Sequence, residues 1–228
     1  MIPLKNLNPH ATFPAMTVAL IVVNVLVFLY QISLPESVAA GFVSTYGLVP
    51  ARVHLALVGR TTFEAALVPL FTCMFLHGGF LHILGNMWFL WIFGGHVEDR
   101  FGHVPYVGFY LVCGLGSGVS QLIFDWGSKI PSIGASGAIS GVLGAYVMFY
   151  PASRILTLVP LFIFWFTAQI PAIIFIGLWF VVQFLSGLGS LGAVNAGGVA
   201  WWAHVGGFLL GLLFARGARP RRPNYYYE

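Results

Sequence analysis

A serine set among small residues and a distant histidine are the side chains in this sequence best suited to chemistry. Ser136 lies in the run 134–137 (Gly-Ala-Ser-Gly), and His204 lies in the run 203–207 (Ala-His-Val-Gly-Gly). A serine hydroxyl becomes a nucleophile when a base takes its proton, and a neighbouring histidine is the usual base. Both residues lie in apolar segments, where water is scarce. The pair therefore suggests hydrolysis of a peptide bond inside a membrane.

The sequence offers no evident acidic partner for His204. Glu98 and Asp99 fall at the far end of their predicted helix, and Asp125 follows another helix. Many serine hydrolases use such an acid to orient the histidine. We therefore expect a Ser136–His204 dyad, in which helix packing holds the imidazole. The acidic residues of the chain are Glu36, Glu64, Glu98, Asp99, Asp125 and Glu228.

A tetrahedral intermediate also needs hydrogen-bond donors for its negatively charged oxygen. The backbone N–H of Ser136, at a predicted helix N-terminus, is one such donor. His82 and Asn86 could supply two more, and their i, i+4 spacing places them on one helix face. A purely structural role stays open for each: a packed histidine for His82 and an interhelical hydrogen bond for Asn86.

The amino-acid composition indicates whether these residues are surrounded by water or by lipid. Of the 228 residues, 59% are hydrophobic and 7% are charged. A soluble domain carries roughly a quarter charged residues, so this chain lacks the polar surface to cover a globule in water. The sequence therefore predicts an all-α, polytopic membrane bundle.

Six apolar segments are interpreted as membrane spans, each of which needs about 20 mostly apolar residues. The apolar stretch 155–185 is too long for one span, and Pro160 and Pro171 interrupt it, so its first part is interpreted as a connecting or interfacial segment. The first span could also be read as a cleaved signal peptide, but its apolar run is longer than such peptides usually have. The predicted spans are 15–34, 80–93, 106–124, 133–150, 171–185 and 199–215.

Lysine and arginine predict the orientation of the bundle, because they favour cytoplasmic segments. We expect a cytoplasmic segment 1–14, a six-helix domain 15–216 and a basic cytoplasmic tail 217–228. Such a tail lies against anionic lipid head groups, so the net positive charge requires no nucleic-acid partner. The predicted inner residues are Lys5, Arg100, Arg154, Arg216, Arg219, Arg221 and Arg222, and the outer ones are Arg52, Arg60 and Lys129.

This topology places polar residues from three spans at similar depth. Ser136 and His204 fall near the outer ends of spans four and six, and His82 and Asn86 near the outer end of span two. Polar side chains in a membrane usually face the bundle interior or a cavity. One cavity open to the outer face accounts for all four. His77 also lies nearby, although a catalytic role for it is a weaker hypothesis.

Two glycine pairs flank the reactive residues. Gly137 and Gly141 are four residues apart on span four, and Gly207 and Gly211 are four apart on span six. Such pairs let two helix backbones approach closely in lipid. They are common packing motifs by themselves, but here they would bring a short serine side chain within reach of a histidine.

At these residues the chain resembles the rhomboid intramembrane serine proteases of the six-span prokaryotic type. The matching segments are 82–86 (His-Ile-Leu-Gly-Asn), 134–137 (Gly-Ala-Ser-Gly) and 203–204 (Ala-His), the last followed by Gly207 and Gly211. The order of these segments and the six-span layout also match, so the resemblance covers nearly the whole chain.

The resemblance implies that Ser136 is the nucleophile and His204 the general base, with oxyanion binding by His82, Asn86 and the Ser136 backbone N–H. The substrate would be a single-pass transmembrane protein, cut within or just outside its membrane segment. No metal or cofactor is implied. Because no Arg- and Ser-rich presequence is evident, we expect the plasma or inner membrane, with the site toward the outer face. The aromatic-rich span 171–185 would be a lateral gate, or it simply faces lipid.

Two positions depart from the family pattern. Ser140 stands one turn after Ser136, where many members place an aromatic residue that supports the catalytic histidine. The first outer loop contains Arg52 and Arg60 but no tryptophan, although many members carry a Trp-Arg pair there. We therefore expect both the support of His204 and the anchoring of this loop to differ.

Other functions agree less well with the sequence. A catalytically inactive rhomboid-like protein that binds membrane clients is the main alternative, but such relatives typically lack the serine or the histidine. A transporter or channel predicts charged residues or broken helices at mid-membrane, and a metalloprotease predicts a His-Glu-x-x-His motif. Cys73 and Cys113 are too few for a disulfide framework. The sequence predicts neither the particular substrate nor the oligomeric state.

Overall fold

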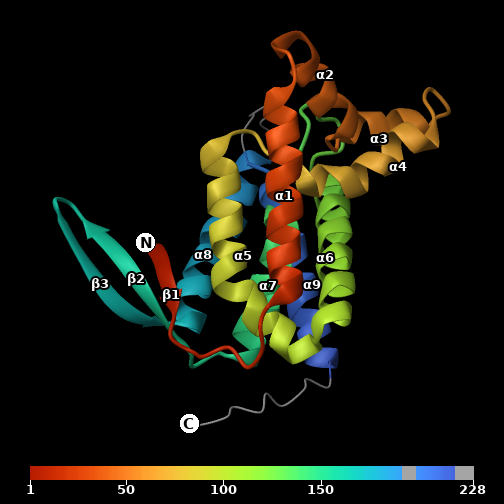
Figure 1. Cartoon of the computed structure of the whole chain (residues 1–228). Coiled ribbons are helices and arrows are strands. Elements are labelled where there is room, and N and C mark those ends of the chain that lie inside the picture. The colour runs from red at the N-terminus through yellow and green to blue at the C-terminus, as the bar shows by residue number, and fades with distance from the viewer. Residues whose placement is uncertain (192–198, 219–228) are drawn as a thin grey trace.

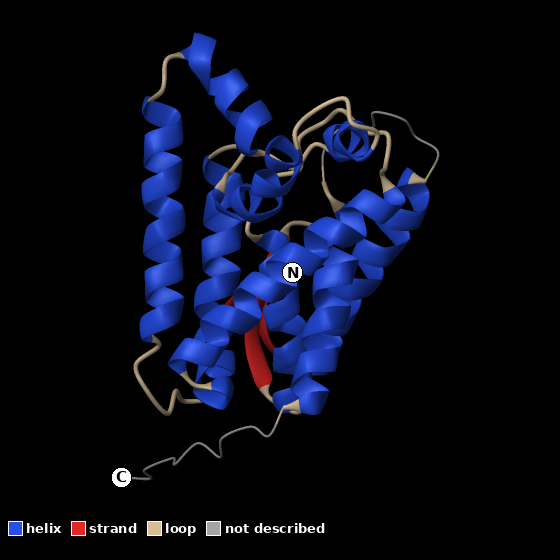
Figure 2. Cartoon of the chain, turned by 90° about the vertical axis from the view of Figure 1, so that its right-hand side faces the viewer, coloured by secondary structure: helices blue, strands red, loops and turns tan. Residues whose placement is uncertain are grey.

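The computed structural model describes residues 1–191 and 199–218. It is a bundle of long helices with short helices at one end and a small three-stranded sheet beside the other (Figure 1). Figure 2, turned by 90°, shows the strands lying behind the helices. Arg219, Arg221, Arg222 and Glu228, which the sequence analysis assigns to a tail, lie outside the described residues.

The long helices confirm the predicted helical membrane bundle. Among the described residues, four helices are long and apolar enough to cross a membrane: α1 (Ala15–Ser33), α5 (Phe80–Phe101), α6 (His103–Phe124) and α8 (Ala172–Ser190). Two further helices are shorter: α7 (Ser136–Phe149) has 14 residues and α9 (Trp201–Gly217) has 17. The expectation of six crossings stays a prediction.

The short helix α7 forms the centre of the bundle. Every residue from 137 to 146 is buried, and α5, α6 and α9 pack around it. Its 14 residues correspond to about 21 Å of helix, at about 1.5 Å per residue. The hydrocarbon core of a bilayer is about 30 Å thick. α7 is therefore shorter than the hydrocarbon core is thick.

Glycines bring α7 and α9 into direct backbone contact, as the two glycine pairs predict. A Cβ atom added at Gly207 would lie 2.0 Å from the carbonyl oxygen of Gly137, and one added at Gly211 would lie 2.0 Å from that of Gly141. These distances are far below van der Waals contact. Only glycine therefore fits at positions 207 and 211 when the helices are this close.

The acidic pair at the end of α5 holds the beginning of α1. The Glu98 carboxylate accepts hydrogen bonds from the backbone N–H groups of Met16 and Thr17, at 3.0 and 2.8 Å. Asp99 accepts from the backbone N–H of Thr12 at 3.0 Å. A negative charge at a helix N-terminus is stabilising because it satisfies free N–H groups and opposes the helix dipole. These two acids are therefore occupied at the end of the bundle away from Ser136.

Short helices cover the other end of the bundle: α2 (Glu36–Tyr46), α3 (Pro50–Leu57), α4 (Phe63–Thr72) and the 3-10 turn η1 (Cys73–Phe75). Pro50 occupies the first turn of α3, where its missing N–H costs nothing, and the Thr62 side chain caps α4. The loop is anchored by a backbone bridge between Leu48 and Ser132. The Arg52 guanidinium donates to the Thr45 carbonyl and the Ser44 hydroxyl, both at 3.3 Å.

A sheet stands where the sequence analysis expects a connecting or interfacial segment. The strands β1 (Ile2–Asn6), β2 (Arg154–Leu161) and β3 (Phe164–Pro171) pair antiparallel in that order. The buried Asn6 side chain donates a 2.7 Å hydrogen bond to the Tyr146 hydroxyl. The N-terminal segment is thereby attached to the bundle. The sequence reasoning did not predict these strands.

The α7–α9 contact gives a direct stability prediction. Gly211→Ala puts a methyl group against the Gly141 carbonyl, so the two helices must separate, and we expect a loss of about 1–3 kcal/mol as in other overpacked cores. The apparent melting temperature in detergent should fall accordingly. Gly177→Ala is the matched control, because nothing lies within 4 Å of its added Cβ. Equal melting temperatures for the two variants would contradict the close contact.

Candidate functional site

Ser136 is the first residue of α7, and the turn before it depends on a glycine. Gly134 has φ of +127°, a backbone conformation that residues with a side chain rarely adopt. Its backbone N–H donates to the Cys73 carbonyl at 2.9 Å, which ties the turn to η1. Ser136 follows at the helix start, where a backbone N–H has no partner within its own helix. The serine side chain and this free N–H therefore lie together.

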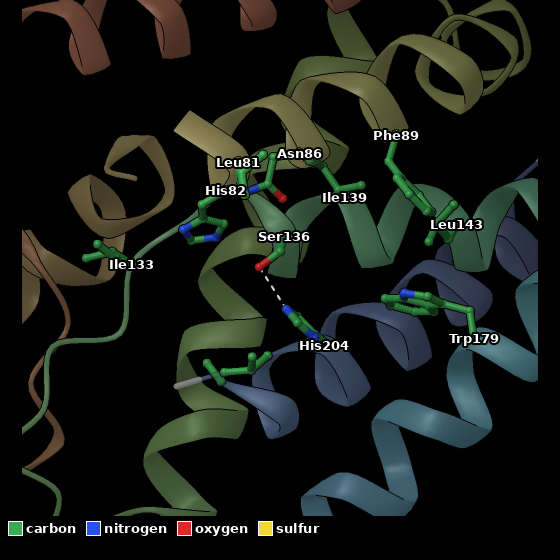
Figure 3. Close-up of a pocket in the computed structure, with 13 residues that line it drawn as sticks. Leu81, His82, Asn86, Phe89, Ile133, Ser136, Ile139, Leu143, Trp179 and His204 are labelled. Carbon is green, nitrogen blue, oxygen red and sulfur yellow. Dashed lines mark hydrogen bonds between the residues drawn. The ribbon is translucent and has the colours of Figure 1, made fainter. Parts of the chain in front are cut away.

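Ser136 and His204 meet directly. Ser136 Oγ and His204 Nε2 are 2.8 Å apart, and the hydroxyl donates to the imidazole (Figure 3). His204 lies in the first turn of α9 and is buried. The glycine contacts between α7 and α9 allow this short distance. The structure thus brings together the two residues that the sequence analysis singles out.

Side chains of α6 fix the start of α9 beside His204. The amide oxygen of Gln121 accepts a hydrogen bond from the backbone N–H of Ala203 at 3.1 Å. The amide nitrogen of Gln121 donates to Asp125 at 3.1 Å, which orients the glutamine. Ser120 donates to the carbonyl of Trp202 at 2.8 Å. Asp125 therefore contributes to the position of α9 without contacting His204.

The second nitrogen of His204 is held by a glutamine that the sequence reasoning missed. His204 Nδ1 lies 2.7 Å from Gln183 Oε1, and because an amide oxygen only accepts, the Nδ1–H donates. This leaves Nε2 free to accept the Ser136 proton. Gln183 comes from α8 and is buried. A buried amide in a span without charged side chains was a signal that could have identified it.

Aromatic rings of α8 and α9 flank His204 in place of a side chain at position 140. The rings of Trp179 and His204 have centroids 5.9 Å apart, and the Trp201 ring meets His204 edge-on at 6.3 Å. Ser140 is fully buried, and its hydroxyl donates to the Ser136 carbonyl at 2.6 Å. The support of His204 therefore comes from the two helices beside α7.

His82, at the beginning of α5, presents one ring nitrogen to the serine. Its Nδ1 accepts a hydrogen bond from the backbone N–H of Gly78 at 3.2 Å. A neutral imidazole with Nδ1 as acceptor carries its proton on Nε2. That Nε2 lies next to Gly134, since a Cβ there would be 2.8 Å from it and 3.6 Å from Ser136 Oγ. His82 therefore has an N–H available close to the serine, in a space that Gly134 keeps open.

Asn86 supplies a second available donor. Its side chain is buried, with 8% of its surface exposed, yet Nδ2 has no hydrogen-bond partner among the described residues. A buried amide N–H without a partner costs roughly 1–3 kcal/mol. Figure 3 shows Asn86 beside His82 above Ser136. The amide is therefore placed to donate to a group that enters this space.

His77 is close to His82, but it is not among the residues that line the cavity around Ser136. It lies in the turn before α5, fully buried, and its ring meets that of His82 edge-on at 5.2 Å. Burial, with a smaller contribution from the neighbouring His82, lowers the pKa of His77 to about 4. The ring is therefore neutral at physiological pH. Its backbone is held by the side chain of Gln31, which donates to the His77 carbonyl at 2.7 Å.

One cavity of about 370 Å³ contains Ser136, His204, His82 and Asn86. None of the described residues that line it carries a lysine, arginine, aspartate or glutamate side chain. Within residues 1–191 and 199–218, no group of three or more His, Cys, Asp or Glu side chains is arranged to hold a metal ion. The remaining lining is mostly apolar and comes from α5, α7, α8, the loop before α7 and the residues around the start of α9: Leu81, Gly85, Phe89, Ile133, Ile139, Leu143, Trp179, Val199 and Ala200.

Comparison with known proteins agrees with this geometry. The rhomboid domain model matches residues 64–221. RHOMBOID-like protein 5 of Arabidopsis thaliana is 33% identical over 172 residues, which cover 75% of this chain and 50% of that protein. RHOMBOID-like protein 7 of the same plant is 34% identical over 156 residues, covering 68% and 44%.

A shorter match is to the rhomboid protease GluP of Bacillus subtilis (strain 168), 40% identical over 76 residues, covering 33% of this chain and 14% of that protein. This chain spans half or less of the length of these three relatives. The domain match nevertheless covers more than half of the chain and includes all four polar residues of the cavity. The chain belongs to the rhomboid family.

Proposed function

We propose that this chain is an intramembrane serine endopeptidase that cleaves single-pass transmembrane proteins within or next to their membrane segment. The observation that carries the proposal is the 2.8 Å contact between Ser136 Oγ and His204 Nε2 inside a largely apolar cavity. A serine hydroxyl bonded to a buried imidazole has no evident structural purpose in a membrane bundle, where polar groups are costly.

In the proposed reaction, His204 takes the Ser136 proton at Nε2 as Oγ attacks the substrate carbonyl. Nδ1–H keeps its hydrogen bond to Gln183 throughout, so the ring does not rotate. His204 then gives the proton to the leaving nitrogen, and an acyl-enzyme forms. A water molecule, deprotonated by the same Nε2, releases the acyl group and restores the serine.

Three donors converge on the space where the negatively charged oxygen develops. They are the backbone N–H of Ser136, Nε2–H of His82 and the amide of Asn86. Fixed donors of this kind stabilise the transition state because they need no reorganisation as charge appears. The Asn86 amide, which has no partner among the described residues, supports this role, since substrate would supply its missing acceptor.

The proposed substrate route lies between α5 and α8. Leu81, Gly85 and Phe89 line the cavity from α5, and Trp179 lines it from α8. Nearby contacts between these helices are aromatic, with the ring centroid of Phe175 of α8 6.4 Å from that of Phe89. An apolar seam of this kind is suited to parting beside a transmembrane segment.

We further propose that the protein sits in the plasma or inner membrane with both termini cytoplasmic and the site toward the outer face. Lys5, Arg154 and Arg216 support this orientation, because all three belong to elements that meet at one end of the bundle, and lysine and arginine favour the cytoplasmic side. The opposite end holds Arg52 and Arg60.

Replacing the nucleophile is the central test of the proposal. We expect Ser136→Ala to abolish cleavage of a single-span substrate in detergent or vesicles, with a loss of about 10³-fold or more. His204→Ala should do the same, and labelling by a fluorophosphonate probe should require both residues. Unchanged melting temperatures show that the variants remain folded. Cleavage by Ser136→Ala at the wild-type rate would contradict the role of Ser136 as nucleophile, whereas absence of cleavage by the wild-type chain would favour a client-binding protein without this chemistry.

Asn86 gives a test of the oxyanion donors. Asn86→Ala removes one donor that acts only in the transition state, so kcat should fall by about 10²–10³-fold with little change in KM. Asn24→Ala, which alters a buried amide on α1 remote from the cavity, is the matched control and should keep wild-type kcat. A KM increase at constant kcat for Asn86→Ala would instead assign this side chain to substrate binding.

Gln183 is a positioning residue in this proposal, because it acts through His204. Gln183→Leu removes the acceptor for Nδ1–H, and the loss of about 1–3 kcal/mol for a buried hydrogen bond corresponds to about 5–150-fold in kcat. Gln183→Glu keeps an acceptor at the same reach, so it should recover activity relative to Gln183→Leu and move the acidic limb of the pH–rate profile. A purely structural role for Gln183 predicts instead that both variants melt earlier and share the wild-type pH profile.

A further inference from the structure

The hairpin formed by β2 and β3 ends in a run of exposed apolar side chains. Phe162 is 95% exposed, Ile163 84%, Phe164 69% and Trp165 62%. Leu161 and Phe166 on either side are about half exposed. We call residues 161–166 the hairpin tip. These side chains contact little of the bundle, and no described element covers them.

Beyond Arg154 at its base, the hairpin lacks the charged side chains that a water-exposed edge strand usually carries. Residues 155–171 contain no lysine, arginine, aspartate or glutamate. Within the described sheet β3 pairs only with β2, so its outer edge carries unpaired backbone groups. An apolar edge strand that faces water promotes association with other chains, and proteins usually blunt such edges with charge. The absence of charge therefore indicates that something other than water surrounds the tip.

The position of the hairpin indicates what that surrounding is. The hairpin leaves the bundle near the base of α7 and splays outward past α8, so its tip lies beside the helices and not beyond their ends (Figure 1). β3 continues directly into α8, whose first turn exposes Ile173 and Ile174. The apolar surface of the hairpin is thus continuous with the flank of a helix that is apolar enough to span a membrane.

Charge is arranged at the opposite end of the same sheet. Arg154 begins β2, where it pairs with Pro171, and Lys5 of β1 pairs with Leu156. Both basic side chains are exposed. The sheet therefore changes from basic at its base to aromatic at its tip. Basic residues favour anionic phosphate groups, whereas tryptophan and phenylalanine favour the boundary between head groups and acyl chains.

We propose that the hairpin tip inserts into the lipid leaflet beside α8, with Lys5 and Arg154 against the phosphates of that leaflet. The unpaired edge of β3 limits the depth, because free backbone N–H and C=O groups need water or head groups as partners. The tip therefore rests at the level of the upper acyl chains and does not cross the hydrocarbon core. This inference concerns membrane attachment and does not depend on the proposed protease activity.

A fluorescent reporter at the tip tests the insertion. In the full chain with both buried cysteines replaced (Cys73→Ala, Cys113→Ala), Phe162→Cys is labelled with the environment-sensitive dye NBD and placed in phosphatidylcholine–phosphatidylglycerol vesicles. We expect blue-shifted emission, strong quenching by lipids with a nitroxide near the top of the acyl chain, and weak quenching by aqueous iodide. Ile163→Cys is a second reporter and should behave alike.

Two matched positions calibrate the result. Leu29→Cys lies on the flank of α1, where the side chain is 50% exposed, and should show the lipid pattern. Lys129→Cys lies in the exposed loop between α6 and α7 and should show the aqueous pattern.

The double variant Lys5→Gln and Arg154→Gln tests the basic end of the sheet. With Lys5 and Arg154 present, added phosphatidylglycerol should increase the protection of the tip from iodide. In the double variant this increase should be lost.

Two outcomes would overturn the proposal. Iodide quenching at position 162 equal to that at Lys129→Cys would place the tip in water. Protection from both iodide and nitroxide lipids would mean that protein covers the tip, as when a second copy pairs along β3. Melting temperatures equal to that of the cysteine-free parent confirm that each labelled chain is folded.

Discussion

The contact between α7 and α9 is made by backbone atoms, because glycines occupy the facing positions on both helices. A Cβ at Gly207 would lie 2.0 Å from the Gly137 carbonyl oxygen, so any larger residue would force the helices apart. Serine has one of the shortest polar side chains, and its hydroxyl reaches His204 only across such a contact. In lipid, close packing of this kind also replaces the hydrophobic force that holds a soluble core together.

Two neighbouring helices then fix the position of α9 and of His204 relative to Ser136. α6 contributes Gln121, which holds the first turn of α9 through the Ala203 N–H, and α8 contributes Gln183, which holds the imidazole itself. Gln121 joins α6 to α9 and Gln183 joins α8 to α9, each through a hydrogen bond to α9 that needs no ionised group. The geometry of the serine and histidine therefore depends on four helices, although only two of them carry the reacting groups.

Much of the bundle and of its polar cavity could be predicted from sequence, and the reasons are physical. Scarcity of charge predicts a membrane bundle, and polar residues within apolar segments mark its interior, so the amino-acid sequence alone is enough to group Ser136, His204, His82 and Asn86. Gln183 was not identified because α8 is apolar on all sides, so the apolar pattern does not indicate which face of this helix points toward the cavity. The strands of the hairpin were not predicted because an uninterrupted apolar run fits a buried helix, a strand or an interfacial segment equally well. Only the pairing of β2 with β1 and β3 distinguishes these possibilities.

The hydrogen bonds of His204 have a consequence for the cost of placing this site in lipid. With Nδ1–H donating to an amide and Nε2 accepting from a hydroxyl, the imidazole is uncharged, and no ionised side chain lines the cavity in the described part of the chain. Transferring an isolated ion into a medium of low dielectric constant is expensive, so a resting carboxylate there would burden the folded state at all times. In the proposed reaction, charge exists only briefly, as an imidazolium and an oxyanion that form together a few ångströms apart. The pair has almost no net charge to solvate. The site therefore needs no permanent ion in the protein, and the surrounding lipid does not have to be distorted to solvate one.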